Sequence, residues 1–476
     1  SGGGDGGHDA PPGARTGAAA GLSGLFRRLG TDLTTQATSS NSPRTVAHNE
    51  DHEEVEVEAL AAGAAAGSSG DLVSCFYNWY GSRFLIPLLR RGEDKTSATY
   101  QRRLWRHKRK KRFLSDAMKL ANKGEASFRK MDDQVAILDN EIEHCTRILF
   151  HPFEDIVVVC NVYDQVGVWA WKEGNRRCLF HNGNPPGTSL TNACFINDHD
   201  QPLLAASSSD GVVRIWDHPH ISNPAQGTSS YISGGTYSMT ARGRVRPKLV
   251  TAFKALTDLP PGTKVVGSKL VMDWQQEHGV LATSGDVNVV RIWNMERELK
   301  MQDISTRENV YVTSLTNDAP MGRTIIAGAD DGSVRTFDVR SNNTRYGAGL
   351  TMSELKSRVI SVHRVKSSSL VVAATMDGNV KVWDIRKHSQ SLRTIAGMRG
   401  AMSSMVVHDY VPLLACGSHS QKIRVFNLSG EELSMIRYHD GFLGQRIGPI
   451  SCLAFHPYLP YLAAGARDSI VSIYKG

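Results

Sequence analysis

Histidine and cysteine are the residue types in this 476-residue sequence that we consider first as ligands of a metal ion. His218 and His220 form a His-x-His pair, which is one way to bring two imidazole ligands together. Pro219 separates them, and a polar segment follows, so a loop is the favoured interpretation. The seven cysteines are dispersed without a CxxC pair, which is typical of reduced, buried thiols. The sequence therefore predicts no metal site and no cofactor.

Three aspartates resemble candidate catalytic carboxylates: Asp210, Asp331 and Asp377. Each precedes a glycine and each occupies the same place in a repeated pattern, which favours a role in capping tight turns. The sequence also lacks the nucleophile elbow of serine hydrolases, the HExxH zinc motif and the P-loop. We therefore predict no catalytic residue and expect that the chain is not an enzyme.

A basic run at Arg106–Arg112 could serve nuclear import or nucleic-acid binding. Residues 1–131 contain 20 Lys and Arg against 14 Asp and Glu, whereas residues 132–476 contain 35 against 33. The larger part of the chain is therefore nearly neutral, and no basic stripe extends across it. This distribution disfavours nucleic acid and favours a solvated helix face or a contact with an acidic partner.

The elements that must position these residues belong to a sevenfold repeat between about Val157 and Tyr474. Each copy contains a strand of small residues, a turn and a strand that ends in an aromatic residue. These aromatic residues are Trp169, Trp216, Trp293, Phe337, Trp383, Phe426 and Tyr474. They are 43–48 residues apart, except for a step of 77 between the second and the third. Such a period with Trp-Asp endings is typical of a WD-repeat β-propeller with four strands per blade.

The predicted fold is all-β: a seven-bladed WD-repeat β-propeller preceded by a disordered linker and a short helical connector. Residues 1–70 are low in complexity, so we expect a disordered linker there. Residues 71–131 form the aromatic and basic connector, and residues 132–476 form the propeller. The chain ends just after the last aromatic residue, so Gln134–Leu138 should supply the outer strand of the last blade. The long step contains an insertion around residues 218–248.

The connector should contain a helix over residues 96–123. Its apolar stripe is predicted to comprise Tyr100, Leu104, Trp105, Leu114, Met118 and Ala121. Within the blades, the strands of Ala, Ser and Gly should lie close to the central channel. No run of 18 apolar residues occurs, so we expect no membrane span.

The most specific part of the sequence is Tyr438–Pro457, with YHDGFLGQRIGPISCLAFHP. This stretch resembles the C-terminal blade of the Raptor family, the regulatory-associated proteins of TOR. Further similar stretches are FHNGNP at residues 180–185, SGD at residues 284–286 and LACGS at residues 414–418. The resemblance covers about residues 71–476 and implies the C-terminal part of such a protein.

The resemblance implies a non-enzymatic scaffold that recruits substrates to the TOR kinase and links it to nutrient signals. It implies TOR kinase, other TOR-complex subunits and TOR substrates as partners. The implied location is the cytoplasm, with recruitment to the lysosome or vacuole surface. The chain departs from strong WD repeats, because only Trp216-Asp217 and Trp383-Asp384 are true Trp-Asp pairs.

A partner should bind at a rim of the propeller, and the candidate contacts are Phe442, Gln445 and Arg446. An equally weighted alternative is that this loop folds back onto its own blade. Two other functions stay open. One is a nuclear WD-repeat protein that binds nucleic acid through Arg106–Arg112. The other is a propeller enzyme, which would need polar side chains in the channel that the Ala, Ser and Gly strands do not indicate.

Overall fold

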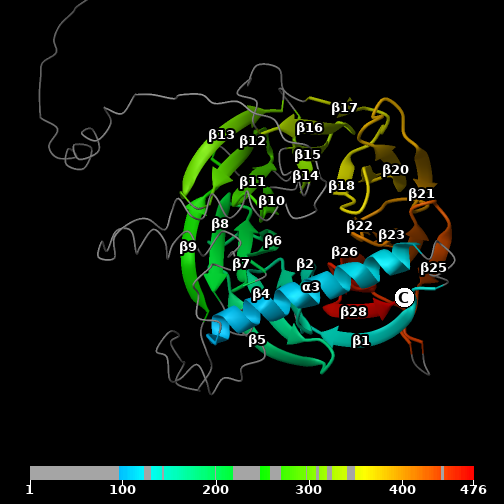
Figure 1. Cartoon of the computed structure of the whole chain (residues 1–476). Coiled ribbons are helices and arrows are strands. Elements are labelled where there is room, and N and C mark those ends of the chain that lie inside the picture. The colour runs from blue at the N-terminus through cyan, green and yellow to red at the C-terminus, as the bar shows by residue number, and fades with distance from the viewer. Residues whose placement is uncertain are drawn as a thin grey trace, which may run out of the picture. The chain divides into compact units, whose positions relative to one another are not determined.

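Seven four-stranded antiparallel sheets are arranged as blades around a central axis (Figure 1). The computed structural model describes residues 96–122, 130–141, 144–198, 200–217, 247–257, 270–295, 297–306, 310–318, 324–339, 349–440 and 444–476. The predicted seven-bladed propeller is therefore confirmed. The predicted linker at residues 1–70, the His218/His220 pair and most of the insertion at residues 218–248 lie outside the described residues.

Each blade contains an inner, a second, a third and an outer strand. Blade 1 consists of β2 (Cys145–Phe150), β3 (Ile156–Asn161), β4 (Gln165–Ala170) and β5 (Asn175–His181), and blade 2 consists of β6 (Leu190–Ile196), β7 (Leu203–Ser208), β8 (Val212–Asp217) and β9 (Lys248–Lys254). Blade 3 consists of β10 (Leu270–Gln275), β11 (Val280–Gly285), β12 (Val287–Asn294) and β13 (Leu299–Ser305), and blade 4 consists of β14 (Val312–Asn317), β15 (Thr324–Ala329), β16 (Val334–Asp338) and β17 (Thr351–Met352). Blade 5 consists of β18 (Val359–Arg364), β19 (Leu370–Thr375), β20 (Asn379–Asp384) and β21 (Arg393–Ala396). Blade 6 consists of β22 (Ser404–Val407), β23 (Leu413–Ser418), β24 (Lys422–Asn427) and β25 (Glu432–Ile436). Blade 7 consists of β26 (Ile450–Phe455), β27 (Tyr461–Ala466), β28 (Ile470–Lys475) and β1 (Asp133–Asp139).

Strand β1 closes the ring, because this N-terminal strand completes the last blade. It pairs antiparallel with β28, with Gln134 opposite Tyr474 and Ile137 opposite Ser472. The prediction that Gln134–Leu138 supplies the outer strand is therefore confirmed. Joining the two ends of the propeller in one sheet removes the exposed edge that a three-stranded last blade would leave.

The repeated aromatic residues lie near the ends of the third strands and pack between blades. Trp169 of blade 1 packs in one cluster with Ala463 and Val471 of blade 7. Phe426 of blade 6 likewise packs with Val382 of blade 5. The same arrangement, with each aromatic residue against the preceding blade, holds for Trp216, Trp293, Phe337, Trp383 and Tyr474. The repeat therefore fills all seven interfaces between blades with large apolar groups.

The small-residue strands are the second strands of the blades, not the strands that line the channel. A Cβ added at Gly328 would lie 2.5 Å from Cγ1 of Val359, and one at Gly417 would lie 2.6 Å from Cγ2 of Ile450. Val359 and Ile450 begin the inner strands of the next blades. Small residues are therefore needed where blades approach one another closely. The prediction placed these strands close to the central channel as inner strands. That placement is wrong, because they are the second strands and lie one strand farther from the axis.

The Asp-Gly pairs form turns between second and third strands. The Asp210 carboxylate accepts a hydrogen bond from the Val212 N–H at 3.3 Å, and the Asp331 carboxylate accepts one from the Ser333 N–H at 2.9 Å. The Asp377 carboxylate accepts one from the Asn379 N–H at 3.4 Å. The loops at Asp210 and Asp377 contain three residues and the loop at Asp331 contains four, and in each only the glycine has a positive φ, as at Gly378 with a φ of 98°.

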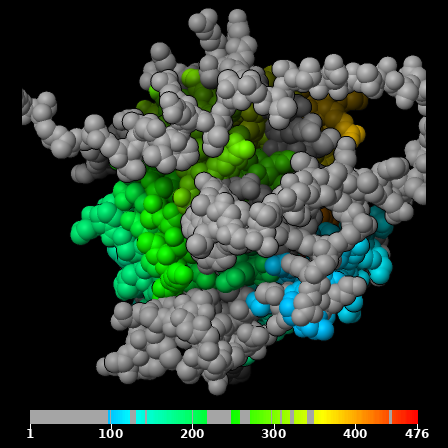
Figure 2. Space-filling model, turned by 60° about the vertical axis from the view of Figure 1, so that its left-hand side comes forward, coloured from blue at the N-terminus to red at the C-terminus, as the bar shows by residue number. Residues whose placement is uncertain are grey.

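Helix α3 (Ala98–Asn122) crosses one face of the propeller, in blue and cyan (Figure 1). The predicted helix over residues 96–123 is thus confirmed. The Ser97 hydroxyl oxygen accepts a hydrogen bond from the Tyr100 N–H at 3.2 Å, as at other helix N-termini. In space-filling view the helix forms part of the molecular surface (Figure 2). Within the described residues, no helix is both long and apolar enough to cross a bilayer.

Candidate interaction surfaces

The inner strands β2, β6, β10, β14, β18, β22 and β26 line a central channel with a volume of about 790 Å3. They all run in the same direction along the axis, so the channel has two distinct ends. We name the end lined by Pro152, Asp198, Lys366, Asp409 and Pro457 the helix mouth, because α3 packs against the loops on this side. We name the end lined by His144, Ser189, Ser403, His419 and Arg467 the distal mouth.

On the helix side, α3 is anchored by a buried arginine. The Arg106 side chain is 1% exposed, and its guanidinium donates hydrogen bonds to the backbone carbonyls of Asp198 and Asp200. Burial lowers the pKa of Arg106 to about 10, so the group stays charged at neutral pH. Arg103 adds an ion pair with Asp200 at 3.1 Å. Toward the other end of the helix, Ala117 packs in the core formed by blades 6 and 7.

The predicted apolar stripe of this helix is wrong in two places. Trp105 is 42% exposed and Met118 is 54% exposed, whereas Arg106 and Ala117 are buried. One buried position is an arginine, because the Arg106 guanidinium reaches carbonyl oxygens on the propeller, which hydrophobic periodicity does not detect. Arg109 lies over the Trp105 ring at 4.7 Å. Part of the basic run Arg106–Arg112 is therefore used inside the protein.

On the distal side, the segment between β25 and β26 forms a hairpin-like loop. Tyr438 and Arg446 form a β-bridge, and the His439 N–H donates to the Gln445 carbonyl at 2.8 Å. The base of this loop folds onto blade 7, because the Asp440 N–H donates to the Gln134 side chain at 2.7 Å. The side chains of Gln445 and Arg446 are exposed.

The candidate contact residues are therefore placed only in part. Arg446 donates a hydrogen bond to the Ser420 carbonyl at 3.4 Å, which links the loop to blade 6. Phe442 lies outside the described residues. The structure thus shows a loop whose base is structural, in line with the alternative interpretation, and whose base residues Gln445 and Arg446 have exposed side chains.

The channel wall is polar, contrary to what the Ala, Ser and Gly strands indicated. The Asp273 carboxylate accepts a hydrogen bond from the Asn317 amide at 2.5 Å, and burial raises the pKa of Asp273 to about 6. Lys366 pairs with Asp409 at 2.8 Å near the helix mouth. Sequence reasoning missed these residues because they lie on the inner strands or directly after them, and because they do not repeat from blade to blade.

A serine and a histidine also meet in this wall. Nε2 of His363 lies 3.0 Å from the Ser361 hydroxyl, and that hydroxyl donates to the Met405 carbonyl, also at 3.0 Å. Burial lowers the pKa of His363 to about 4. Because the serine proton is directed to a backbone carbonyl, this pair lacks the arrangement of a nucleophile activated by its base.

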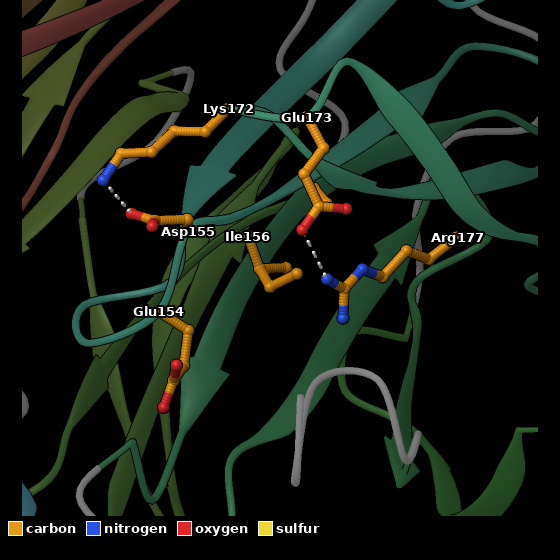
Figure 3. Close-up of a pocket in the computed structure, with 7 residues that line it drawn as sticks. Glu154, Asp155, Ile156, Lys172, Glu173 and Arg177 are labelled. Carbon is orange, nitrogen blue, oxygen red and sulfur yellow. Dashed lines mark hydrogen bonds and ion pairs between the residues drawn. The ribbon is translucent and has the colours of Figure 1, made fainter. Parts of the chain in front are cut away.

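A smaller pocket of about 190 Å3 lies among the loops of blade 1 (Figure 3). Four of its charged side chains form two ion pairs, Lys172 with Asp155 at 2.8 Å and Arg177 with Glu173 at 3.3 Å. Among the described residues, no three His, Cys, Asp or Glu side chains gather as a metal site would require. Burial raises the pKa of the Cys160 and Cys416 thiols to about 12, which disfavours reactive thiolates.

Comparison with known proteins agrees with this architecture. The WD domain, G-beta repeat family matches at residues 183–217, 353–384 and 442–475. The chain is 35% identical over 417 residues to the protein raptor homolog of Dictyostelium discoideum, covering 85% of this chain and 26% of that protein. It is 28% identical to the target of rapamycin complex 1 subunit KOG1 of Saccharomyces cerevisiae, covering 85% of this chain and 26% of that protein.

The solved structure of Raptor from Chaetomium thermophilum is also similar, with a TM-score of 0.63 and 26% identity. The match covers 89% of this chain and 37% of the Raptor chain. The chain thus spans about a quarter of the length of the curated relatives that it matches. These matches show that the chain is similar to Raptor proteins over about 85% of its own length, including its propeller region.

Proposed function

We propose that this relative of Raptor is a non-catalytic adaptor that provides a protein-interaction surface to a TOR complex. The similarity to Raptor and KOG1 over 85% of the chain is the observation that carries the proposal. Its partners are the TOR kinase, other subunits of the complex and TOR substrates, and its role is to support substrate recruitment and nutrient or growth signalling. Its location is the cytoplasm, with recruitment to the lysosome or vacuole surface as part of the complex.

The structure supports an adaptor in two ways. A closed propeller is a rigid scaffold that presents loops at its rims, and loops on rigid scaffolds are common binding elements. The loop at residues 438–446 has a base held by hydrogen bonds to Gln134 and exposes Gln445 and Arg446. Exposed side chains on a backbone that is already fixed pay a smaller ordering penalty on binding. We infer that Phe442, Gln445 and Arg446 contact a partner. Nucleic acid is not part of this proposal, because Arg106 points into the propeller.

The test is co-purification of TOR-complex proteins with the tagged chain and with a Phe442→Ala/Arg446→Ala double variant. We expect the double variant to retain its thermal transition and to lose at least about tenfold in partner recovery, as when interface hot spots are removed. The matched control is Leu392→Ala/Arg386→Ala, which removes one exposed apolar and one exposed arginine side chain on the opposite side.

Equal recovery with both double variants would contradict the assignment of the loop. No recovery of TOR-complex proteins by the unmodified chain would contradict the adaptor role of this region. Loss of the thermal transition in the Phe442→Ala/Arg446→Ala variant would show that the loop is structural.

A further inference from the structure

Arg147 places a positive charge inside the channel and forms no ion pair with the described residues. Its side chain is exposed to the channel from β2, and it makes no hydrogen bond or ion pair with the residues that the structure describes. Burial has the largest effect on the pKa values of Cys194, Asp273 and His363, and the positive charge of Arg147 acts to lower each of these pKa values. These residues lie on three other inner strands, so the guanidinium is near the axis.

A second arginine lies at the distal mouth and is held in position. Nη2 of Arg467 lies 3.3 Å from Nε2 of His419. A guanidinium can only donate, so the imidazole accepts through Nε2. Burial and the neighbouring Arg467 lower the pKa of His419, which is consistent with a neutral ring. His419 therefore orients Arg467 and does not neutralise its charge.

The two arginines belong to neighbouring parts of the ring. The Arg467 carbonyl accepts a hydrogen bond from the N–H of His144, three residues before Arg147. Ser404, on the inner strand of blade 6, also lines the channel, and its hydroxyl makes no hydrogen bond with the described residues. Blades 6, 7 and 1 thus place Ser404, Arg467 and Arg147 in the distal half of the channel wall.

No carboxylate lines this end of the channel among the described residues. The channel-lining carboxylates are Asp198, Asp273 and Asp409. Asp198 and Asp409 are at the helix mouth, and Asp273 lies two residues deeper along its strand than the position equivalent to Arg147. The carboxylate next to Arg467, that of Asp468, accepts from the Ile470 N–H within its own turn at 3.4 Å. The described side chains that line the distal mouth therefore include an arginine and no carboxylate.

We propose that the distal mouth binds a phosphate monoester group through Arg147, Arg467 and Ser404. Two guanidinium groups that have no ion pair with the described residues match a phosphate, because each can donate two parallel charge-assisted hydrogen bonds to its oxygens. A serine hydroxyl donates a further bond, and the partly enclosed channel strengthens these interactions relative to bulk water. The group is carried by a phosphorylated side chain of a protein or by a small phosphorylated molecule.

The test is isothermal titration calorimetry, in which inorganic phosphate is titrated into the full chain at low ionic strength. We expect saturable binding, and we expect Arg147→Gln and Arg467→Gln each to weaken it by about tenfold or more, since each removes charge-assisted hydrogen bonds. Arg386→Gln is the matched control, because it removes the same charge from an exposed loop on the helix side. Each variant must keep the thermal transition of the unmodified chain, as expected for exposed side chains.

Two further titrants separate the sources of the phosphate. A phosphoserine peptide that binds at least about tenfold more tightly than glycerol 3-phosphate would identify a protein source, and comparable affinities would identify a small phosphate monoester. The proposal is overturned by absence of phosphate binding up to about 10 mM. It is also overturned if Arg386→Gln weakens binding as much as Arg147→Gln does.

Discussion

His408 should make the protein lose stability as the pH falls, and a single substitution can isolate its contribution. The side chain is fully buried. Its Nδ1 accepts hydrogen bonds from the N–H groups of Tyr410 and Val411 at 3.2 and 3.1 Å, and Nε2 lies 3.2 Å from the Leu459 carbonyl. This arrangement requires the neutral ring with its proton on Nε2, since a proton on Nδ1 would face two donors.

Burial lowers the pKa of His408 to about 4 from its ordinary value of 6.5. Below pH 6.5 the unfolded chain binds a proton at this residue that the folded protein does not, so stability falls as the pH falls toward 4. Between about pH 7.5 and about pH 5 this linkage removes about 2 kcal/mol from the free energy of unfolding. That is a sizeable part of the 5–15 kcal/mol typical of globular proteins.

The substitution His408→Asn tests this magnitude. The Asn Oδ1 can accept the bonds that Nδ1 accepts, but the side chain does not titrate, and it loses the bond to Leu459. We expect the variant to be about 1–3 kcal/mol less stable at about pH 7.5. Most of that difference should disappear at about pH 5, where the wild type has lost its own 2 kcal/mol.

The assay is equilibrium urea unfolding followed by tryptophan fluorescence at both pH values. His278→Asn is the control, because this histidine is exposed. Asp273 contributes with the opposite sign, since burial raises its pKa to about 6, but it is present in both proteins and cancels in the comparison. Equal pH dependence of the wild type and His408→Asn would refute the reasoning.

Three other predictions follow from packing and burial. Gly378→Ala should lower the free energy of unfolding by at least about 2 kcal/mol more than Gly400→Ala in urea unfolding. Both glycines have positive φ, but a Cβ would meet backbone carbonyls only at the first. Arg106→Met should speed tryptic cleavage within α3 severalfold and leave the propeller intact, whereas Arg112→Met, whose side chain is 83% exposed, should not. Cys160 should react with iodoacetamide only after denaturation, because burial raises the pKa of its thiol to about 12; modification of the native protein, detected by mass spectrometry, would contradict this.

The blades could be predicted from the sequence because the repeated residues meet structural requirements that recur from blade to blade. Every interface between blades needs a large apolar group, which Trp169 and its six equivalents supply. Turns between second and third strands need a residue tolerant of positive φ, which Gly378 supplies. The closing strand was predictable because the last repeat stops after Tyr474, one strand short of a complete blade.

The orientation of α3 could not be predicted, because its buried face does not follow hydrophobicity alone. Arg106 is 1% exposed, while Trp105 beside it is 42% exposed. The arginine is stabilised by carbonyl groups of Asp198 and Asp200, which are distant in sequence. This contact can be recognised only in the folded protein, where the loop between β6 and β7 of blade 2 lies next to the helix.

The channel was hidden for a related reason. Residues equivalent by strand register to Arg147 have no common character: they are Asn192, Val271, Ser314, Ser361, Ser404 and Cys452. Their neighbours on the second strands are small, because the next blade approaches there, whereas the channel leaves space in front of these side chains. Packing therefore places little restriction on residue type at these positions. An unpaired arginine at such a position is not required by the propeller, and this is why we assign it to a ligand and not to the fold.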